Sequence, residues 1–337
     1  MKKIMKNRTP THSNAHANAP DIFDNLREGF RFVAENAAHV TIHHDVIAAY
    51  AESLPASAPQ NAFDDVHHYT GATEDTACYI LALDSINFGS GYEPALLAEG
   101  WSLIDESLYF TLATHLKQYF ESSGPLNAQA LMAMDTEQCL EILHLPKDGA
   151  MSREFAALCA RGMRELGADV AENHAGLFDS FVQAANGKSE DIVRRLITMH
   201  HFKDIHAYKG RDVAFYKRAQ ITAADLYLGY KQMGIDVFDD TDRLTMFADN
   251  AVPHVLRVDG LLSYTDSLAQ KIAAEQDIKS GSEEEIELRA CAAHVVELIA
   301  AHKGLRAMDI DHILWHKSVE AARYNQSPPH RTLSRFY

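Results

Sequence analysis

Three stretches of the sequence place charged or amide side chains in apolar surroundings, and each has residue types that a binding or catalytic site needs. The first is LDSINFGSGY, residues 83–92, which contains Asp84, Asn87 and Phe88. A carboxylate, an amide and an aromatic ring close together can hydrogen-bond and stack a flat polar ligand. The alternative is an Asx turn, in which Asp84 and Asn87 bond only to their own backbone.

The second stretch is FYKRAQITAADL, residues 215–226. If it is helical, Arg218 and Asp225 lie two turns apart on one face, and Lys217 lies on an adjacent stripe. Buried cations need partners such as carboxylates or a bound phosphate, because an unpaired buried charge is costly. The alternative is a solvated basic face.

The third stretch is LTMFADNAVPHVL, residues 244–256. Asp249 follows an apolar segment and precedes Pro253, so we expect a helix to end near it. A carboxylate at such an edge, in a low local dielectric, can act as a general base or stabilise a cation. The alternative is a carboxylate that only caps the helix end.

Nineteen histidines raise the question of a metal site. His312 and His316 are four residues apart and could face one ligand from the same helix turn. A zinc-protease motif needs Glu directly after the first His, but Ile313 stands there, and no third ligand is evident. The motif Gly89-x-Gly91 also lacks the third glycine of a dinucleotide site. We therefore predict no metal and no other cofactor.

Hydrophobic spacing predicts that helices carry most of these residues. Helical spacing begins at Ile22, where the apolar positions are Phe23, Leu26, Phe30 and Val33. Helix-capping signals fall at Asp135 with Gln138, at Ser189, and at Ser282 with Glu285, and Gly304 is predicted to end the last of these helices.

A short apolar run at 79–83 instead predicts one buried strand that leads into the Gly89-Ser90-Gly91 loop. Pro55 and Pro59 predict a loop over residues 53–62. With so few strand signals and no clean linker, we expect residues 21–337 to form a single globular domain that is mainly α with a small β element.

Composition limits the possible functions. The 337 residues include 31 Lys and Arg against 47 Asp and Glu, a formal charge of −16, which argues against a general binder of nucleic-acid backbones. Four scattered cysteines argue against a disulfide framework and favour the cytoplasm. No apolar run approaches the roughly 20 residues that span a bilayer. Residues 1–20 predict a disordered leader.

Taken together, the motifs resemble those of the queuosine salvage protein family. They are LDSINFGSGY, FYKRAQITAADL, LTMFADNAVPHVL, ELRACAAHVVELI, HILWHKS and HRTLSRFY, in this order, and the resemblance covers roughly residues 22–337. It implies an N-glycosyl hydrolase that cleaves queuosine 5′-monophosphate and releases queuine, a modified base used in transfer RNA. It also implies a fold similar to that of helix-hairpin-helix DNA glycosylases.

The resemblance also suggests roles for individual residues. Asp249 is the expected catalytic carboxylate, and Lys217 lies near it, where it keeps Asp249 ionised, positions water, or holds phosphate or ribose oxygens. Asp84, Asn87 and Phe88 are expected to grip the base.

Further substrate-binding candidates follow from the same resemblance. His254 and Trp315 are candidates for the pocket wall, and Asp225 is a further candidate for substrate contact. Arg218, His330 and Arg331 are candidates for the 5′-phosphate or for structural ion pairs.

Three other functions remain open at this point. A DNA or RNA base glycosylase of the helix-hairpin-helix type would use base flipping on a polymer. A non-catalytic helical nucleotide-binding protein would release no product. A helical metalloenzyme would depend on His312 and His316. We expect a small-molecule substrate and neither a nucleic-acid polymer nor a membrane as partner.

Overall fold

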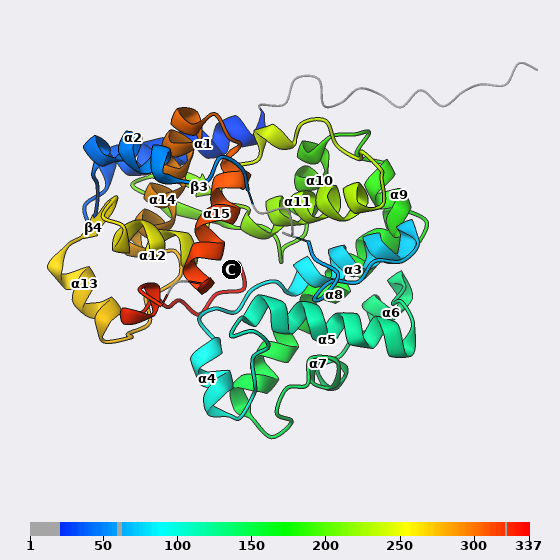
Figure 1. Cartoon of the computed structure of the whole chain (residues 1–337). Coiled ribbons are helices and arrows are strands. Elements are labelled where there is room, and N and C mark those ends of the chain that lie inside the picture. The colour runs from blue at the N-terminus through cyan, green and yellow to red at the C-terminus, as the bar shows by residue number, and fades with distance from the viewer. Residues whose placement is uncertain (1–20, 59–62, 321) are drawn as a thin grey trace, which may run out of the picture.

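The computed structural model describes residues 21–58, 63–320 and 322–337 (Figure 1). The predicted leader, residues 1–20, and part of the predicted 53–62 loop lie outside the described residues. Helices make up most of the described chain, and the strands are short, which confirms the mainly α prediction.

The elements, in chain order, are α1 (Ile22–Asn36), β1 (Val40–Ile42), α2 (His44–Ser53), α3 (Thr73–Ile86), α4 (Glu93–Ala98), α5 (Leu108–Ser123), α6 (Ala128–Ala133), α7 (Thr136–Ile142), α8 (Ala150–Asn173), α9 (Phe178–Gln183), α10 (Ser189–Leu196), β2 (Ile205–Tyr208), β3 (Arg211–Ala214), α11 (Lys217–Gln232), the 3-10 helix η1 (Thr241–Arg243), α12 (Ala251–Val258), β4 (Leu262–Tyr264), α13 (Asp266–Ala273), α14 (Glu283–Lys303), α15 (Ala307–Glu320) and the 3-10 helix η2 (Tyr324–Gln326).

The helices form two groups (Figure 1). In the first group α3, α6, α7 and α9 pack against the long helix α8, and α5 packs against α3 and α7. In the second group α1, α2, α12 and α15 pack against α14. Helix α11 joins them, because it packs on α3 and also on α10, which contacts α1. None of the helices in the described ranges is long and apolar enough to cross a membrane.

Helix α1 shows how the sequence pattern becomes packing. The four residues predicted to share its apolar face, Phe23, Leu26, Phe30 and Val33, are all buried. The helix packs mainly against α14, and Asp21 caps it by accepting a hydrogen bond from the Asp24 amide. The helical prediction from residue 22 onward is therefore confirmed.

The predicted strand at 79–83 is wrong, because these residues lie within α3. Every residue of α3 from Thr76 to Ile86 is buried, since α5, α8, α9 and α11 surround the helix. A helix covered on all sides has no polar face, and its sequence shows no helical period. A short apolar run of this kind reads equally well as a buried strand.

The small β element consists of two antiparallel pairs elsewhere in the chain. Strand β1 pairs with β4, which brings Val40 opposite Tyr264, and β2 pairs with β3 in a hairpin. The hairpin turn is Lys209-Gly210, with φ values of 46° and 80°, the left-handed conformation that such tight turns need.

The helix caps test the sequence pattern directly. Asp135 and Gln138 form the predicted reciprocal capping box of α7. Ser282 caps α14 by accepting from the Glu285 amide, while the Glu285 side chain accepts from the Gly281 amide. Gly304 ends α14 in the left-handed conformation, as predicted.

The predicted cap at Ser189 is wrong. Ser189 is the first residue inside α10, and its backbone N–H donates to the carboxylate of Asp240 at 2.6 Å. Asp240 also accepts from the Glu190 amide, so a distant acid takes the role that the serine side chain would have had.

Candidate active site

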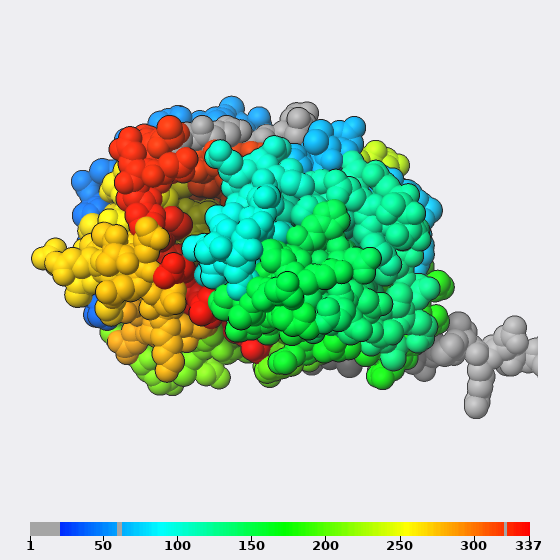
Figure 2. Space-filling view, turned by 90° about the horizontal axis from the view of Figure 1, so that it is seen from below, coloured from blue at the N-terminus to red at the C-terminus, as the bar shows by residue number. Residues whose placement is uncertain are grey.

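A cavity of about 400 Å³ opens between the two groups of helices. Figure 2 shows the hollow from below, with the red C-terminal residues lying between the yellow to orange segment that includes α13 and the cyan segment that includes α4. Nine of the eleven predicted site residues line the cavity: Asn87, Phe88, Lys217, Asp225, Asp249, His254, Trp315, His330 and Arg331. The other two, Asp84 and Arg218, are buried and do not line it.

Asp249 lies just before a helix. Because α12 begins at Ala251, the prediction that a helix ends near Asp249 is wrong. The Asp249 carboxylate accepts a hydrogen bond from the Ala251 amide at 2.9 Å, and its side chain is half-buried. A carboxylate at a helix N-terminus is favoured by the unpaired amides there.

Side chains from other elements hold the irregular segment that carries Asp249. The Thr245 amide donates to Gln220 at 2.9 Å, and the Phe247 amide donates to the Asp311 carboxyl group at 3.0 Å. Since buried backbone groups need partners, these bonds fix a segment that has no regular structure. Asp249 therefore extends from a rigid support.

A buried ion triad holds the same segment from behind. Arg289 donates to the Ala248 carbonyl at 2.9 Å, to Asp204 at 2.6 Å and to Glu285 at 3.0 Å. Burial opposes the charge on Asp204, but Arg289 holds the pKa of this carboxyl group down at about 2. The peptide next to Asp249 is thus anchored to a fully buried guanidinium group.

Lys217 begins α11 and is buried. Burial lowers the pKa of its ammonium group, and the negative charge of Asp249 is the largest influence that opposes this shift. The ammonium nitrogen lies 3.4 Å from both the backbone and the side-chain oxygen of Asn87. Lys217 therefore stands between the end of α3 and the catalytic candidate Asp249.

Asn87 ends α3, and Asp84 supports it from one turn earlier. The Asn87 amide nitrogen donates to Asp84 at 3.1 Å, while the second Asp84 oxygen is buried without a partner among the described residues. Burial raises the pKa of Asp84 to about 7. The structure brings Asn87 to the cavity, whereas Asp84 orients it from behind.

Arg218 contacts the first stretch from the other side. Its guanidinium group donates to the Ser85 carbonyl at 2.7 Å and to the His201 carbonyl, and it stacks over the rings of Phe88 and Phe202. These contacts leave Arg218 outside the cavity lining. Its partners are backbone carbonyls and aromatic rings, not a phosphate site.

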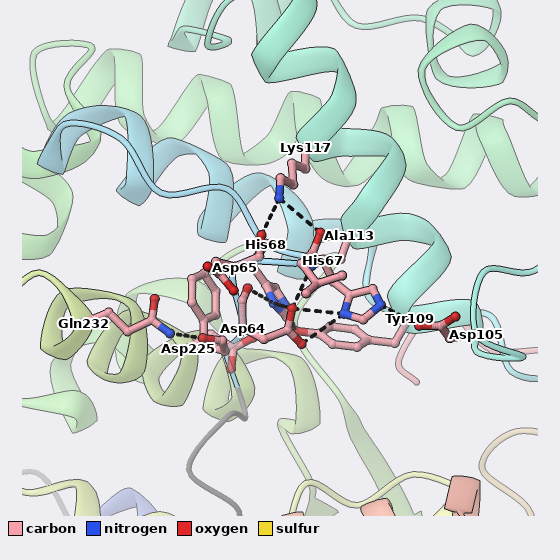
Figure 3. Close-up of polar contacts among 12 residues, drawn as sticks. Asp64, Asp65, His67, His68, Asp105, Tyr109, Ala113, Lys117, Asp225 and Gln232 are labelled. Carbon is pink, nitrogen blue, oxygen red and sulfur yellow. Dashed lines mark hydrogen bonds and ion pairs between the residues drawn. The ribbon is translucent and has the colours of Figure 1, made fainter.

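Asp225 reaches the cavity wall two turns along α11. One of its carboxyl oxygens, Oδ2, lies 3.2 Å from the hydroxyl group of Tyr109, which itself lies 2.8 Å from Nε2 of His68 (Figure 3). Burial raises the pKa of Asp225 well above its ordinary value, and the charge on Asp84 adds to this shift. The wall therefore contains a carboxyl group that strongly disfavours ionisation.

Sequence reasoning missed several residues of the wall, among them Glu93, Tyr109 and Asp311. Asp311 interrupts an apolar helix face between Ile310 and Ile313, a signal that could have identified it. Burial, together with the charge on Asp249, raises its pKa well above its ordinary value. Burial likewise raises the pKa of Glu93 to about 7, but nothing in its local sequence marks it.

The C-terminal residues close one side of the cavity. His330 lies 3.3 Å from the hydroxyl group of Tyr337, and Arg331 donates to Asp277 at 2.6 Å. The Gly89 amide donates to the Tyr337 carbonyl at 3.1 Å, so the tail is attached to the loop that follows α3. His254 is bonded to the Tyr324 carbonyl at 2.8 Å and supports the same side.

His312 and His316, the two histidines considered as metal ligands, both lie on α15 and line the cavity. In the part of the chain that the structure describes, neither belongs to a group whose ligand atoms lie close enough together to hold a metal ion. Within the described residues, the group with metal-binding spacing is instead His39, Glu283 and Glu287. The Glu287 carboxylate there already accepts from the amides of residues 38–40 and from a tyrosine hydroxyl group.

The arrangement suits one kind of chemistry. Aromatic and amide groups can hold a flat polar ligand, while Asp249 supplies a fixed negative charge beside a buried cation. Asp84, Asp225, Asp311 and Glu93 disfavour ionisation. Such a site can stabilise positive charge that develops on a ligand near Asp249 and can activate water there.

Comparison with known proteins points in the same direction. The queuosine salvage protein family matches residues 67–337. Proteins named queuosine 5′-phosphate N-glycosylase/hydrolase are similar along most of the chain. The one from Sphaerobacter thermophilus is 34% identical over 91% of this chain and 96% of its own. The one from Dictyostelium discoideum is 35% identical over 79% of each chain, and the one from Mus musculus is 27% identical over 92% of this chain and 98% of its own.

Proposed function

The chain belongs to the queuosine salvage protein family, and from this we propose that it hydrolyses the N-glycosidic bond of queuosine 5′-phosphate and releases queuine. The observation that carries the proposal is the position of Asp249 and Lys217 in the lining of one cavity, within a chain that matches enzymes of that name over nearly their full length.

The chemistry of the leaving base explains why a carboxylate is needed. Departure of the base leaves an oxocarbenium-like sugar. Queuine is a 7-deazaguanine, so it has carbon where a purine has a protonatable N7, and acid assistance to the leaving group is limited. Stabilising the sugar cation therefore matters more, and Asp249 does this while it orients or deprotonates the attacking water.

The remaining residues divide between the base and the sugar phosphate. Asn87, oriented by Asp84, hydrogen-bonds the guanine-like edge of the base, and Phe88 and Trp315 border its faces. His330 and Arg331, on the tail, are the candidates for the 5′-phosphate. Lys217 acts on Asp249 or on the water, since its ammonium group lies beside the α3 end and is influenced most by Asp249 among the charged groups.

The size of the cavity and the net charge of the chain favour a free nucleotide as substrate. A cavity of about 400 Å³ is in the range of small-molecule sites. The formal charge of −16 opposes binding of a polymer backbone. Incubation with queuosine-containing transfer RNA and with free nucleotide, followed by mass detection of queuine, shows which of the two is the substrate.

We also propose that residues 21–337 form one domain, that its architecture is like that of helix-hairpin-helix DNA glycosylases, and that the protein is located in the cytoplasm.

Asp249→Asn tests the catalytic assignment. The amide keeps the shape of the side chain but loses the negative charge, so we expect release of queuine to fall by about a thousandfold or more. Binding of the intact nucleotide, measured by calorimetry, should survive.

Asp239→Asn is the matched control, because Asp239 is an exposed carboxylate paired with Lys188 on the surface, and it should keep wild-type turnover. An Asp249→Asn enzyme with wild-type turnover would refute the assignment, and a wild-type enzyme that releases no queuine would refute the proposed reaction.

A further inference from the structure

A chain of three side chains leads from the cavity wall into the protein (Figure 3). Asp225 lines the cavity, and its Oδ2 lies 3.2 Å from the Tyr109 hydroxyl oxygen. The same hydroxyl oxygen lies 2.8 Å from Nε2 of His68, and Nδ1 of His68 lies 3.0 Å from the backbone carbonyl oxygen of Asp64. Each of these three contacts is a hydrogen bond that needs one hydrogen atom, and the hydrogens available on His68 and Tyr109 decide whether Asp225 must supply its own.

The first of these hydrogens lies on the ring of His68. A carbonyl oxygen only accepts, so Nδ1 carries the hydrogen that is shared with Asp64. Burial lowers the pKa of the His68 ring to about 4, which makes the ring neutral at pH 7. A neutral imidazole has one N–H, and Nε2 is therefore an acceptor.

The second hydrogen belongs to Tyr109. Its hydroxyl group has a single hydrogen, and the 2.8 Å contact with the accepting Nε2 of His68 uses it. Nothing remains on Tyr109 to donate to Asp225. An ionised Asp225 would then face the lone pairs of the Tyr109 oxygen at 3.2 Å with no hydrogen between them.

We propose that Asp225 is a neutral carboxylic acid that donates its hydrogen to Tyr109, and that its other oxygen accepts a hydrogen bond from an N–H group on the edge of the bound base. Among the described residues, that other oxygen has no hydrogen-bond partner, and Asp225 is on the cavity wall. The assignment of the base as its partner rests on the proposed function. The protonation state does not, because it follows from the contacts of the free protein together with the neutral ring of His68.

The charged surroundings agree with this protonation state. Asp84 on α3 disfavours a second negative charge, whereas Lys217, on the same helix as Asp225, favours one. Burial is the largest influence and raises the pKa of Asp225 well above its ordinary value. Behind Tyr109, the ammonium group of Lys117 and the ring of His67 further disfavour a charged His68, and Asp64 opposes them.

A neutral acceptor has a catalytic advantage over a carboxylate at this position. As the glycosidic bond breaks, its electron pair moves onto the base, which becomes negatively charged. A carboxylate beside the base would repel that charge, while a neutral C=O group holds the N–H edge without this cost. Asp249 and Asp225 are then two acids in one cavity with opposite protonation states, each suited to the charge that develops near it.

The first test is infrared spectroscopy of the ligand-free protein. Wild type minus Asp225→Asn should show the C=O stretch of a protonated carboxylic acid at neutral pH, and Asp239→Asn, the control at a surface carboxylate paired with Lys188, should keep that band. A difference spectrum that contains only carboxylate bands overturns the proposal. This measurement needs no substrate, so its failure is separate from any failure of the proposed reaction.

The second test is turnover of Asp225→Asn. An amide copies the neutral acid, because its N–H donates to the Tyr109 oxygen and its C=O faces the cavity. We expect kcat/KM for queuosine 5′-phosphate to stay within about tenfold of wild type, whereas Asp225→Leu, which has no acceptor, should lose about a hundredfold or more. If Asp225→Asn loses as much as Asp225→Leu, an ionised Asp225 is required and the proposal is wrong.

A third variant tests the hydrogen-bond chain. Tyr109→Phe removes the acceptor of the Asp225 hydrogen while the ring is kept, so the carboxylic acid band should shift in frequency. An unchanged band would show that Tyr109 does not hold this hydrogen, and would overturn the proposed direction of the bond.

Discussion

Lys217 is the residue where burial and charge compete most directly. Its ammonium group is enclosed, which lowers its pKa, yet Asp249, Asp84 and Asp311 surround it with carboxyl groups that favour the charged form. A buried cation of this kind is retained only where its charge is used or balanced. Its nearest polar contacts are the oxygens of Asn87, at the end of α3.

Lys217→Ala separates the roles that remain open for this residue. If the cation acts on Asp249 or on the water, kcat should fall by about a hundredfold while KM changes by less than about threefold. Ethylammonium added to the buffer should restore part of the activity by occupying the space of the missing side chain. A rise in KM with unchanged kcat would instead assign Lys217 to the phosphate.

The sequence predicted part of this site because part of it is local. Asp249, Lys217 and Asn87 stand in short motifs that are visible without a structure. The contact between Tyr109 and Asp225 has no such signature, because the two residues are 116 positions apart and each lies within an ordinary helical pattern. Long-range pairs of this kind exist only once the helices have packed.

At the scale of elements, two of the three predicted side-chain caps were correct, those at Asp135 and Ser282, whereas the cap at Ser189 and the buried helix α3 were predicted wrongly. Helices α7 and α14 begin at Asp135 and Ser282, whose side chains bond the first free amides, as the sequence indicates. Helix α3 has no side-chain cap at Ala72 and no polar face, so nothing in its sequence distinguishes it from a strand. The element that leads to Asn87 was therefore assigned wrongly.

The contact between α14 and the start of β2 predicts a pH dependence of stability. Arg289 holds the pKa of Asp204 at about 2, below its ordinary value of 3.8. A lowered pKa contributes stability above the ordinary value that is lost as pH falls through about 4 to 2, an effect of about 2 kcal/mol. Urea unfolding at pH 6 and near pH 2 measures this loss.

Asp204→Asn removes the titrating group, so the variant should be less stable than wild type at pH 6 and lose about 2 kcal/mol less on acidification. Asp239→Asn, on the surface, should follow the wild-type curve. Equal acid-induced losses in wild type and Asp204→Asn would show that the ion triad does not contribute in this way.

For the molecule as a whole, the cavity depends on a close approach between distant parts of the chain. Gly91 lies against the backbone of the tail, and a Cβ atom at this position would stand 2.0 Å from the carbonyl oxygen of Thr332. Backbone cannot move aside as a flexible side chain can. Only glycine allows the loop after α3 and the tail to meet here.

Gly91→Ala should therefore displace the tail that carries His330 and Arg331. We expect kcat/KM to fall by at least about tenfold and the free energy of unfolding to fall by about 2 kcal/mol. Gly29→Ala, within α1, is the matched control. A Cβ atom at Gly29 would lie an ordinary 3.7 Å from its nearest neighbour, a side-chain atom of Val213. Gly29→Ala should keep full activity, and a fully active Gly91→Ala enzyme would contradict the tail's role.

The bond between the Gly89 amide and the Tyr337 carbonyl also has a consequence for folding. Closing a loop of nearly 250 residues is entropically costly and comes late in folding. A chain that has not yet made this contact lacks the side of the cavity that residues 330–337 help to form. In refolding from urea, hydrolysis should therefore recover after the circular dichroism of the helices has returned.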